Sequence, residues 1–141
     1  MLEKLFTLLA FLPFFAGCSD DSGNNGPTGP EDLTPPSSSV QALPAQTRQS
    51  PFTVTWAGTD AGSGIQHYDL QWKDGDGPWE DAVQATTSTS QEFHGTDGHT
   101  YSFRSRAMDK AGNQEPYPPG ADAVTLMNLG PDLIWEATVD G

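Results

Sequence analysis

Oxygen-bearing side chains gather in two loops of the sequence. Asp60 lies in a glycine-rich loop, and Asp109, Asn113 and Glu115 follow one another in a second loop. Carboxylate and amide oxygens are the ligands that Ca²⁺ prefers in proteins. Neither loop has the regularly spaced acidic residues of a dedicated calcium loop, and Asp and Asn are ordinary turn residues. We therefore treat these four residues as candidates for a ligand-binding loop, assign no metal site, and keep calcium as an alternative.

Catalytic chemistry is not indicated by the sequence. His67, His94 and His99 stand apart along the chain, without the close spacing that zinc sites favour. We find no nucleophile motif, no phosphate-cradling glycine loop and no convincing pair of acid and base. The sequence therefore predicts a protein that is not an enzyme and needs no cofactor.

Cys18 is the only cysteine, and its surroundings favour chemistry at the thiol. A largely apolar run, 5–15, follows the basic Lys4 and is too short to span a bilayer as a helix. The motif Phe15-Ala16-Gly17-Cys18 that comes next resembles the lipobox of bacterial lipoproteins, in which the cysteine receives lipid. The resemblance implies that residues 1–17 are a signal peptide and that Cys18 is the lipid attachment site.

Lipid attachment at Cys18 would also fix the location of the protein. Each buried methylene of an acyl chain contributes about 0.8 kcal/mol to membrane binding. The mature chain would then be anchored in the bacterial cell membrane or outer membrane, facing the extracytoplasmic space. The alternative is an ordinary secretory signal that is cut near Ala16 and leaves Cys18 as a free thiol.

The charge and the cysteine count limit the partners and the fold. The chain has 6 Lys and Arg against 19 Asp and Glu, and its formal net charge is −13. We exclude nucleic acid as a partner, because binding its phosphates requires a basic patch. A single cysteine cannot form a disulfide within the chain, so the fold must depend on apolar burial. The 141 residues allow one small domain, which we expect to be monomeric.

Residues 18–38 are rich in Gly, Pro, Ser, Asn and acidic residues and contain almost nothing apolar. Such a composition cannot bury enough surface to offset the loss of backbone entropy. The sequence therefore predicts a disordered tether after Cys18. About twenty such residues would span roughly 25 Å.

Beyond the tether, short runs alternate apolar with polar residues, and turn residues separate them. This pattern predicts an all-β domain over 39–129. The expected strands are 40–43, 52–56, 67–73, 79–83, 91–94, 101–107 and 123–129. Seven short strands are typical of an immunoglobulin-like sandwich. The predicted core consists of Phe52, Val54, Trp56, Tyr68, Leu70, Trp72, Tyr101, Phe103 and Ala107.

Several motifs in this domain resemble the fibronectin type III family, particularly its bacterial extracellular members. The matching motifs are Thr34-Pro35-Pro36, Trp56, Tyr68-x-Leu70-x-Trp72, Tyr101 at the position of a tyrosine corner, and the turn Asp109-x-x-Gly112-Asn113. The resemblance covers about 32–129 and implies a seven-stranded antiparallel sandwich. In that topology, the loop around Asp60 and the loop 109–115 emerge at the same end.

These features together predict a membrane-anchored interaction or spacer module whose partner is an unknown protein or glycan. One alternative is a carbohydrate-binding accessory module, for which Trp79 and Tyr117 are the aromatic candidates because each lies in or beside a turn. Another is a fragment of a larger secreted multidomain hydrolase. Residues 130–141 are either a C-terminal tail or the truncated start of a further β domain.

Overall fold

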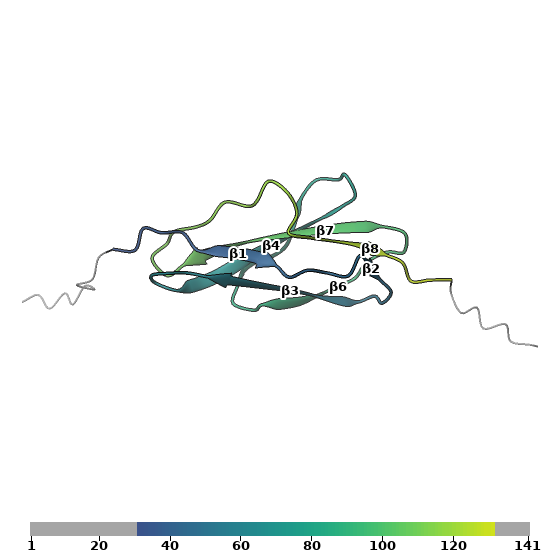
Figure 1. Ribbon diagram of the computed structural model, residues 1–141, viewed down its shortest axis with the longest axis horizontal. Coiled ribbons are helices and arrows are strands. Elements are labelled where there is room, and N and C mark those ends of the chain that lie inside the picture. Colours follow the sequence, from purple (N-terminus) through teal and green to yellow (C-terminus); the bar gives the residue numbers. More distant parts are fainter. Residues whose placement is uncertain (1–30, 132–141) are drawn as a thin grey trace, which may run out of the picture. The chain divides into compact units, whose positions relative to one another are not determined.

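The computed structural model describes residues 31–131, which form a β-sandwich without a helix in that range (Figure 1). Cys18, the predicted signal peptide and most of the residues 130–141 lie outside the described part. The strands are β1 (Ser37–Val40), β2 (Gln46–Thr47), β3 (Phe52–Thr59), β4 (Ile65–Asp74), β5 (Glu80–Thr86), β6 (Ser90–Phe93), β7 (Thr100–Asp109) and β8 (Ala123–Met127).

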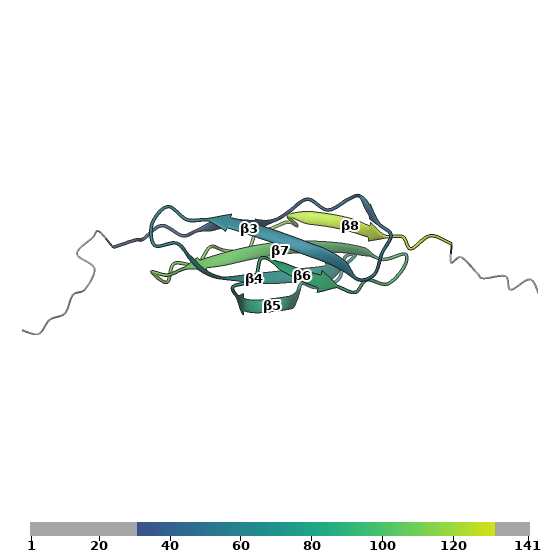
Figure 2. The same ribbon diagram turned by 90° about the horizontal axis from the view of Figure 1, so that it is seen from below.

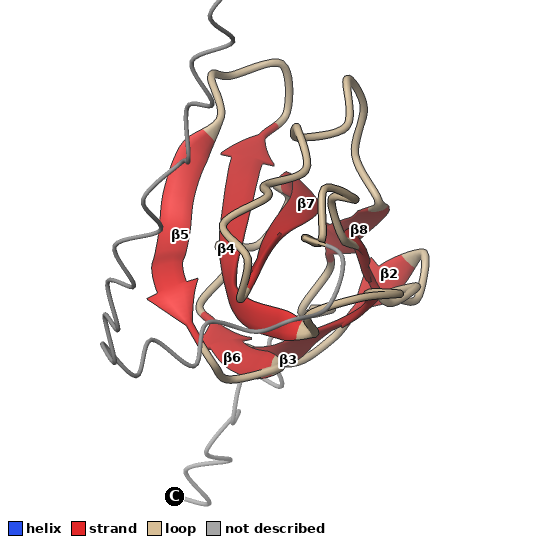
Figure 3. Cartoon of the chain, turned by 90° about the vertical axis from the view of Figure 1, so that its left-hand side faces the viewer, coloured by secondary structure: helices blue, strands red, loops and turns tan. Residues whose placement is uncertain are grey.

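The strands are divided between two sheets. One sheet has the order β1-β3-β6 and the other the order β2-β8-β7-β4-β5. Figure 2 shows β8, β7, β4 and β5 following one another in the larger sheet. Figure 3, a view along the domain, shows β5, β4, β7 and β8 following one another, with β6 and β3 facing them. All the pairings within the described residues are antiparallel except that of β2 with β8, which is parallel.

β2 was not predicted from the sequence, and the first strand lies earlier in the chain than predicted. β1 pairs with β3 and ends at Val40, where the prediction had a strand begin. The chain then crosses to the other sheet, and Pro44 on this crossing has no amide hydrogen for a β ladder. β2 is only two residues long, so it contains no alternation that a sequence pattern could reveal.

The folded domain begins before residue 39. β1 starts at Ser37, and Pro36 before it is already buried. Asp32 accepts a hydrogen bond from the backbone amide of Ser63. Residues 32–38 therefore belong to the domain and not to the predicted tether, because their hydrogen bonds are made to distant loops that a local composition cannot reveal.

Apolar side chains from both sheets meet in the interior. The buried apolar residues are Val40, Val54, Trp56, Tyr68, Leu70, Tyr101, Phe103, Ala107, Ala123 and Met127. Phe52 and Trp72 are partly buried and pack against this cluster. The ring of Phe103 has no exposed surface and lies edge to face with Phe52 and Phe93, which belong to the opposite sheet. These aromatic contacts join the two layers.

The described chain begins at one end of the sandwich and leaves it at the other. The described segment before β1 lies at the left of Figure 1, while the described segment after β8 lies at the right. The turned view in Figure 2 shows the same arrangement. The chain therefore enters the domain at one end and leaves it at the opposite end.

Truncation of the buried Trp56 tests the packing of the core. Trp56 is 2% exposed, and its indole Nε1 is buried without a hydrogen-bond partner. We expect Trp56→Ala to lower the free energy of unfolding by about 3–5 kcal/mol because it leaves a cavity. Trp56→Phe should lose much less, because it keeps a ring and removes an unpaired donor. Chemical denaturation would measure both, and a Trp56→Ala variant as stable as the unsubstituted protein would contradict this packing.

Candidate functional site

Three carboxylates converge at the end of the sandwich where the described chain begins. Asp32 lies in the segment before β1, Asp60 directly follows β3, and Asp109 is the last residue of β7. One carboxylate oxygen from each residue lies within 4.8 Å of those of the other two. We call these three side chains the carboxylate cluster.

Asp109 is held by the turn that follows β7. Its side chain has no exposed surface. Oδ1 accepts a hydrogen bond from the backbone amide of Asn113, and Oδ2 accepts one from the Asn113 side-chain amide, both at 2.8 Å. Gly112 in this turn has φ +94°, a conformation that residues with a side chain rarely adopt. The turn therefore fixes the carboxylate of Asp109 in a buried position.

Asp60 is oriented by the glycine-rich loop between β3 and β4. Its Oδ2 atom accepts hydrogen bonds from the backbone amides of Gly62 at 3.1 Å and Gly64 at 2.6 Å. Its Oδ1 atom is buried and has no hydrogen-bond partner in the described part of the chain. A buried charged oxygen without a partner is costly, because it has lost its hydration without replacement.

Asp32 ties the first described segment to both loops. Its Oδ2 accepts a hydrogen bond from the Ser63 amide at 2.7 Å, and its backbone carbonyl accepts one from the Asn113 side chain at 2.8 Å. A Cβ atom at Gly62 would lie 2.3 Å from the Asp32 carboxylate, so a larger residue at position 62 would displace this carboxylate. The backbone hydrogen bond from Ser63, with another from Thr34, holds the pKa of Asp32 below its usual 3.8.

Basic side chains do not pair with the carboxylate cluster in residues 31–131. The ion pairs in this range join His99 to Asp74 and Arg106 to Asp69. Lys110 follows Asp109 directly and is exposed, and it forms neither of these pairs. The cluster therefore combines three acidic groups, one of them fully buried, and offers the oxygen ligands that hard cations prefer.

The structure brings together only part of the predicted loop residues. Asp60, Asp109 and Asn113 lie together, as expected from the sandwich topology. Glu115 lies elsewhere, because its Oε1 accepts hydrogen bonds from the Ala107 amide at 2.8 Å and from a serine hydroxyl of β1. Sequence reasoning missed Asp32, although the Thr34-Pro35-Pro36 motif two residues later marked this segment as part of the domain.

Trp79 and Tyr117, the predicted aromatic platform, lie in a stack of cations and rings on the outer face of the larger sheet. Arg104 lies over both rings, 4.1 Å from the Trp79 centroid and 4.8 Å from that of Tyr117. Lys73 also approaches Trp79, and Arg106 approaches Tyr117. Cationic side chains thus cover faces of these half-buried rings. The arrangement does not leave the flat, exposed aromatic face that a sugar platform requires.

This stack ends in a buried ion pair. The Nε and terminal nitrogen of Arg106 each lie 2.8 Å from Oδ2 of Asp69, which is 6% exposed. Asp69 Oδ1 also accepts a hydrogen bond from the Ala85 amide of β5, whose φ is +50°. The stack therefore fastens the irregular edge strand β5 to β4 and β7, which indicates a structural role.

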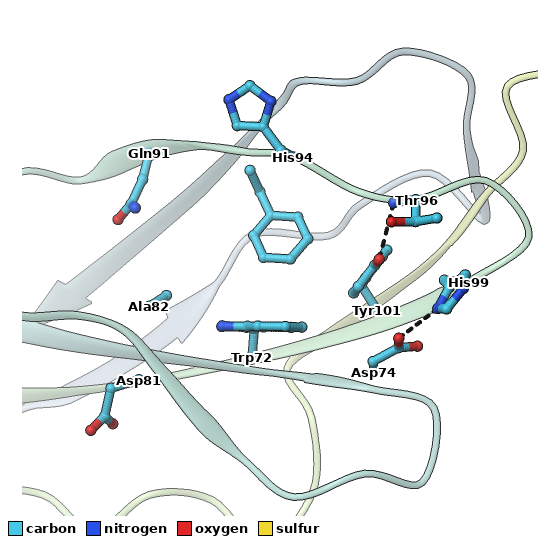
Figure 4. A pocket seen from close by; sticks show the side chains of 10 residues that line it. Trp72, Asp74, Asp81, Ala82, Gln91, His94, Thr96, His99 and Tyr101 are labelled. Atoms are coloured by element: carbon cyan, nitrogen blue, oxygen red, sulfur yellow. Dashed lines mark hydrogen bonds and ion pairs between the residues drawn. The ribbon is translucent and has the colours of Figure 1, made fainter.

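A shallow cleft of about 450 Å³ opens between β5 and β6 (Figure 4). Trp72 and Tyr101 supply apolar surface, while Gln91 and His94 supply polar groups. An Asp74–His99 pair, with 2.5 Å between Oδ2 and Nδ1, closes one end. The cleft combines rings with hydrogen-bonding groups, which suits a small polar ligand.

Comparison of the sequence with models of known protein families and with curated proteins finds no match. Within residues 31–131, the structure contains no helix of the length and apolar character needed to cross a membrane.

Ionisation of Tyr117 tests the stack of cations and rings. Burial raises the pKa of Tyr117 from 10.0 to about 12, although Arg106 and Arg104 partly oppose this. The neutral phenol is favoured in the fold, so its stabilising effect is present below pH 10 and is lost as the pH rises toward about 12. The difference in tyrosinate absorbance between the unsubstituted protein and Tyr117→Phe should therefore develop late in an alkaline titration. A difference that develops around pH 10 would contradict the burial of this phenol.

Proposed function

We propose that this chain is a lipid-anchored extracytoplasmic protein whose β-sandwich acts as a spacer and protein-interaction module. The anchor is Cys18, through the lipobox-like motif that ends at this residue. Cys18 lies outside the described residues, so this part of the proposal depends on the sequence alone.

The single observation that carries the spacer role is the position of the chain at the two ends of the domain. The described segments before β1 and after β8 lie at opposite ends of the sandwich (Figure 1). A domain that is crossed in this way adds its full length between whatever precedes and follows it. If the chain began and left at the same end, the domain would instead project sideways and separate nothing.

The strand order supports an immunoglobulin-like sandwich of the fibronectin type III kind. One sheet joins β1, β3 and β6, and the other places β7 between β8 and β4, with β5 at the edge. The phenolic oxygen of Tyr101 accepts a hydrogen bond from the backbone amide of Thr96 at 3.0 Å. A tyrosine that bonds back to the backbone a few residues upstream is a hallmark of this architecture. Domains of this architecture are common at cell surfaces, which agrees with the proposed location.

Glycan binding is the second candidate function, and the cleft in Figure 4 favours it more than the predicted Trp79 and Tyr117 do. In the cleft, Trp72 and Tyr101 lie near carboxylate, amide and imidazole groups that can hydrogen-bond to sugar hydroxyls. The cleft is shallow, so we place this function second. The hydrolase-fragment alternative gains no support from the comparisons.

Substitution of the anchoring cysteine tests the proposed location. We expect Cys18→Ala to move the protein from the membrane fraction to the soluble fraction of a bacterial host, because the lipid attachment site is lost. Ser19→Ala is the matched control and should remain in the membrane fraction. Intact mass spectrometry of the unsubstituted protein should show acyl chains on residue 18. A Cys18→Ala protein that stays with the membrane would refute lipid anchoring.

A further inference from the structure

We propose that the carboxylate cluster of Asp32, Asp60 and Asp109 binds one calcium ion. Bound there, the ion would fasten the segment before β1 to the two loops that follow β3 and β7. The inference is independent of lipid attachment, because none of the three ligands depends on Cys18.

The dimensions of the cluster suit calcium. Calcium binds oxygen ligands at about 2.3–2.6 Å, so two ligands on opposite sides of one ion lie about 4.6–5.2 Å apart. One oxygen from each of the three carboxylates lies within 4.8 Å of the other two. A single ion can therefore contact all three side chains with little movement of the backbone.

Burial provides an independent reason for a cation. The Oδ1 atom of Asp60 is buried and receives no hydrogen bond from the described residues. Asp109 has no exposed surface, and its two hydrogen bonds come from neutral amide groups of Asn113. A buried carboxylate requires a compensating charge or a change of protonation. A divalent cation would supply both the missing partner of Asp60 and the compensating charge.

The ligand set selects among metals. The cluster offers carboxylate oxygens and contains no histidine or cysteine, so it lacks the ligands that zinc and other transition metals prefer. Magnesium needs shorter distances of about 2.0–2.1 Å and nearly ideal octahedral geometry. Three carboxylates supply only part of a coordination shell, and the flexible geometry of calcium allows water to complete it.

Calcium would link parts of the chain that are far apart in sequence. Asp32 belongs to the segment before β1, Asp60 to the β3–β4 loop, and Asp109 to the end of β7. Existing hydrogen bonds from Ser63 and Asn113 to Asp32 already place this segment on the two loops. The ion would add three contacts between this segment and the two loops. It would therefore make the segment before β1 more rigid.

The test is a calcium titration of the full-length protein, purified in detergent and freed of metal with a chelator. Calcium at about 10 mM is roughly ten times the weakest dissociation constant of extracellular calcium modules, ~10⁻³ M. We expect saturable binding of one ion by calorimetry and a rise of several degrees in melting temperature. Magnesium at the same concentration should produce a much smaller rise.

Two variants localise the effect. Asp60→Asn keeps an oxygen that can accept hydrogen bonds from Gly62 and Gly64 but removes the charge. We expect it to weaken calcium binding about tenfold or more, while in chelator it should melt at the same or a higher temperature because repulsion is relieved. Asp76→Asn removes the same charge from an exposed turn and should bind calcium normally.

Three outcomes would overturn the calcium site. The first is the absence of binding and of any melting shift in the unsubstituted protein. The second is equal loss of binding in Asp60→Asn and Asp76→Asn, which would indicate diffuse attraction to the acidic surface. The third is normal calcium binding by Asp60→Asn. None of these results would alter the membrane fractionation that tests the anchor, so the two proposals can fail separately.

Discussion

The contact of Phe103 with Phe52 and Phe93 is the interaction on which the rest of the domain depends. Phe103 is fully buried at the centre of the larger sheet, and the other two rings reach it from the smaller sheet. The only cysteine is Cys18, so no disulfide within the chain can hold the two layers together. The free energy that keeps the sheets paired must therefore come mainly from apolar burial and ring packing. Replacing one of these rings would loosen the whole sandwich.

The packed layers also determine where the polar chemistry lies. Because β3 and β7 run in fixed positions in facing sheets, the residues at their ends, Asp60 and Asp109, meet at one end of the domain. The described chain also enters the domain at this end. There Asp32 accepts hydrogen bonds from Ser63 of the β3–β4 loop and from Asn113 of the turn after β7. The chain leaves at the opposite end (Figure 1). In the proposed spacer role, fastening of this first segment would transmit orientation as well as distance.

Alternating apolar residues were enough to predict the all-β class and the approximate position of most strands. Val54 and Trp56 on β3, for example, alternate with exposed threonines because one face of the strand is buried. Asp32 could not be predicted in the same way, because its partners Ser63 and Asn113 are distant in sequence. Trp79 and Tyr117 were predicted to be exposed rings, because the residues that cover them are also distant in sequence. Their loops suggested exposure, whereas the β7 arginines that cover both rings, Arg104 and Arg106, are brought there only by the fold.

The most direct test of this account is the distance between the two ends of the domain. Spin labels can be placed at Leu33→Cys and Leu129→Cys in a Cys18→Ala background, because Leu33 is 74% exposed and Leu129 is 40% exposed. Double electron–electron resonance in calcium-containing buffer would then give the distribution of distances between the labels. We expect one narrow distribution close to the full length of the sandwich. A broad distribution, or one centred at a much shorter distance, would contradict a fastened first segment and an end-to-end spacer.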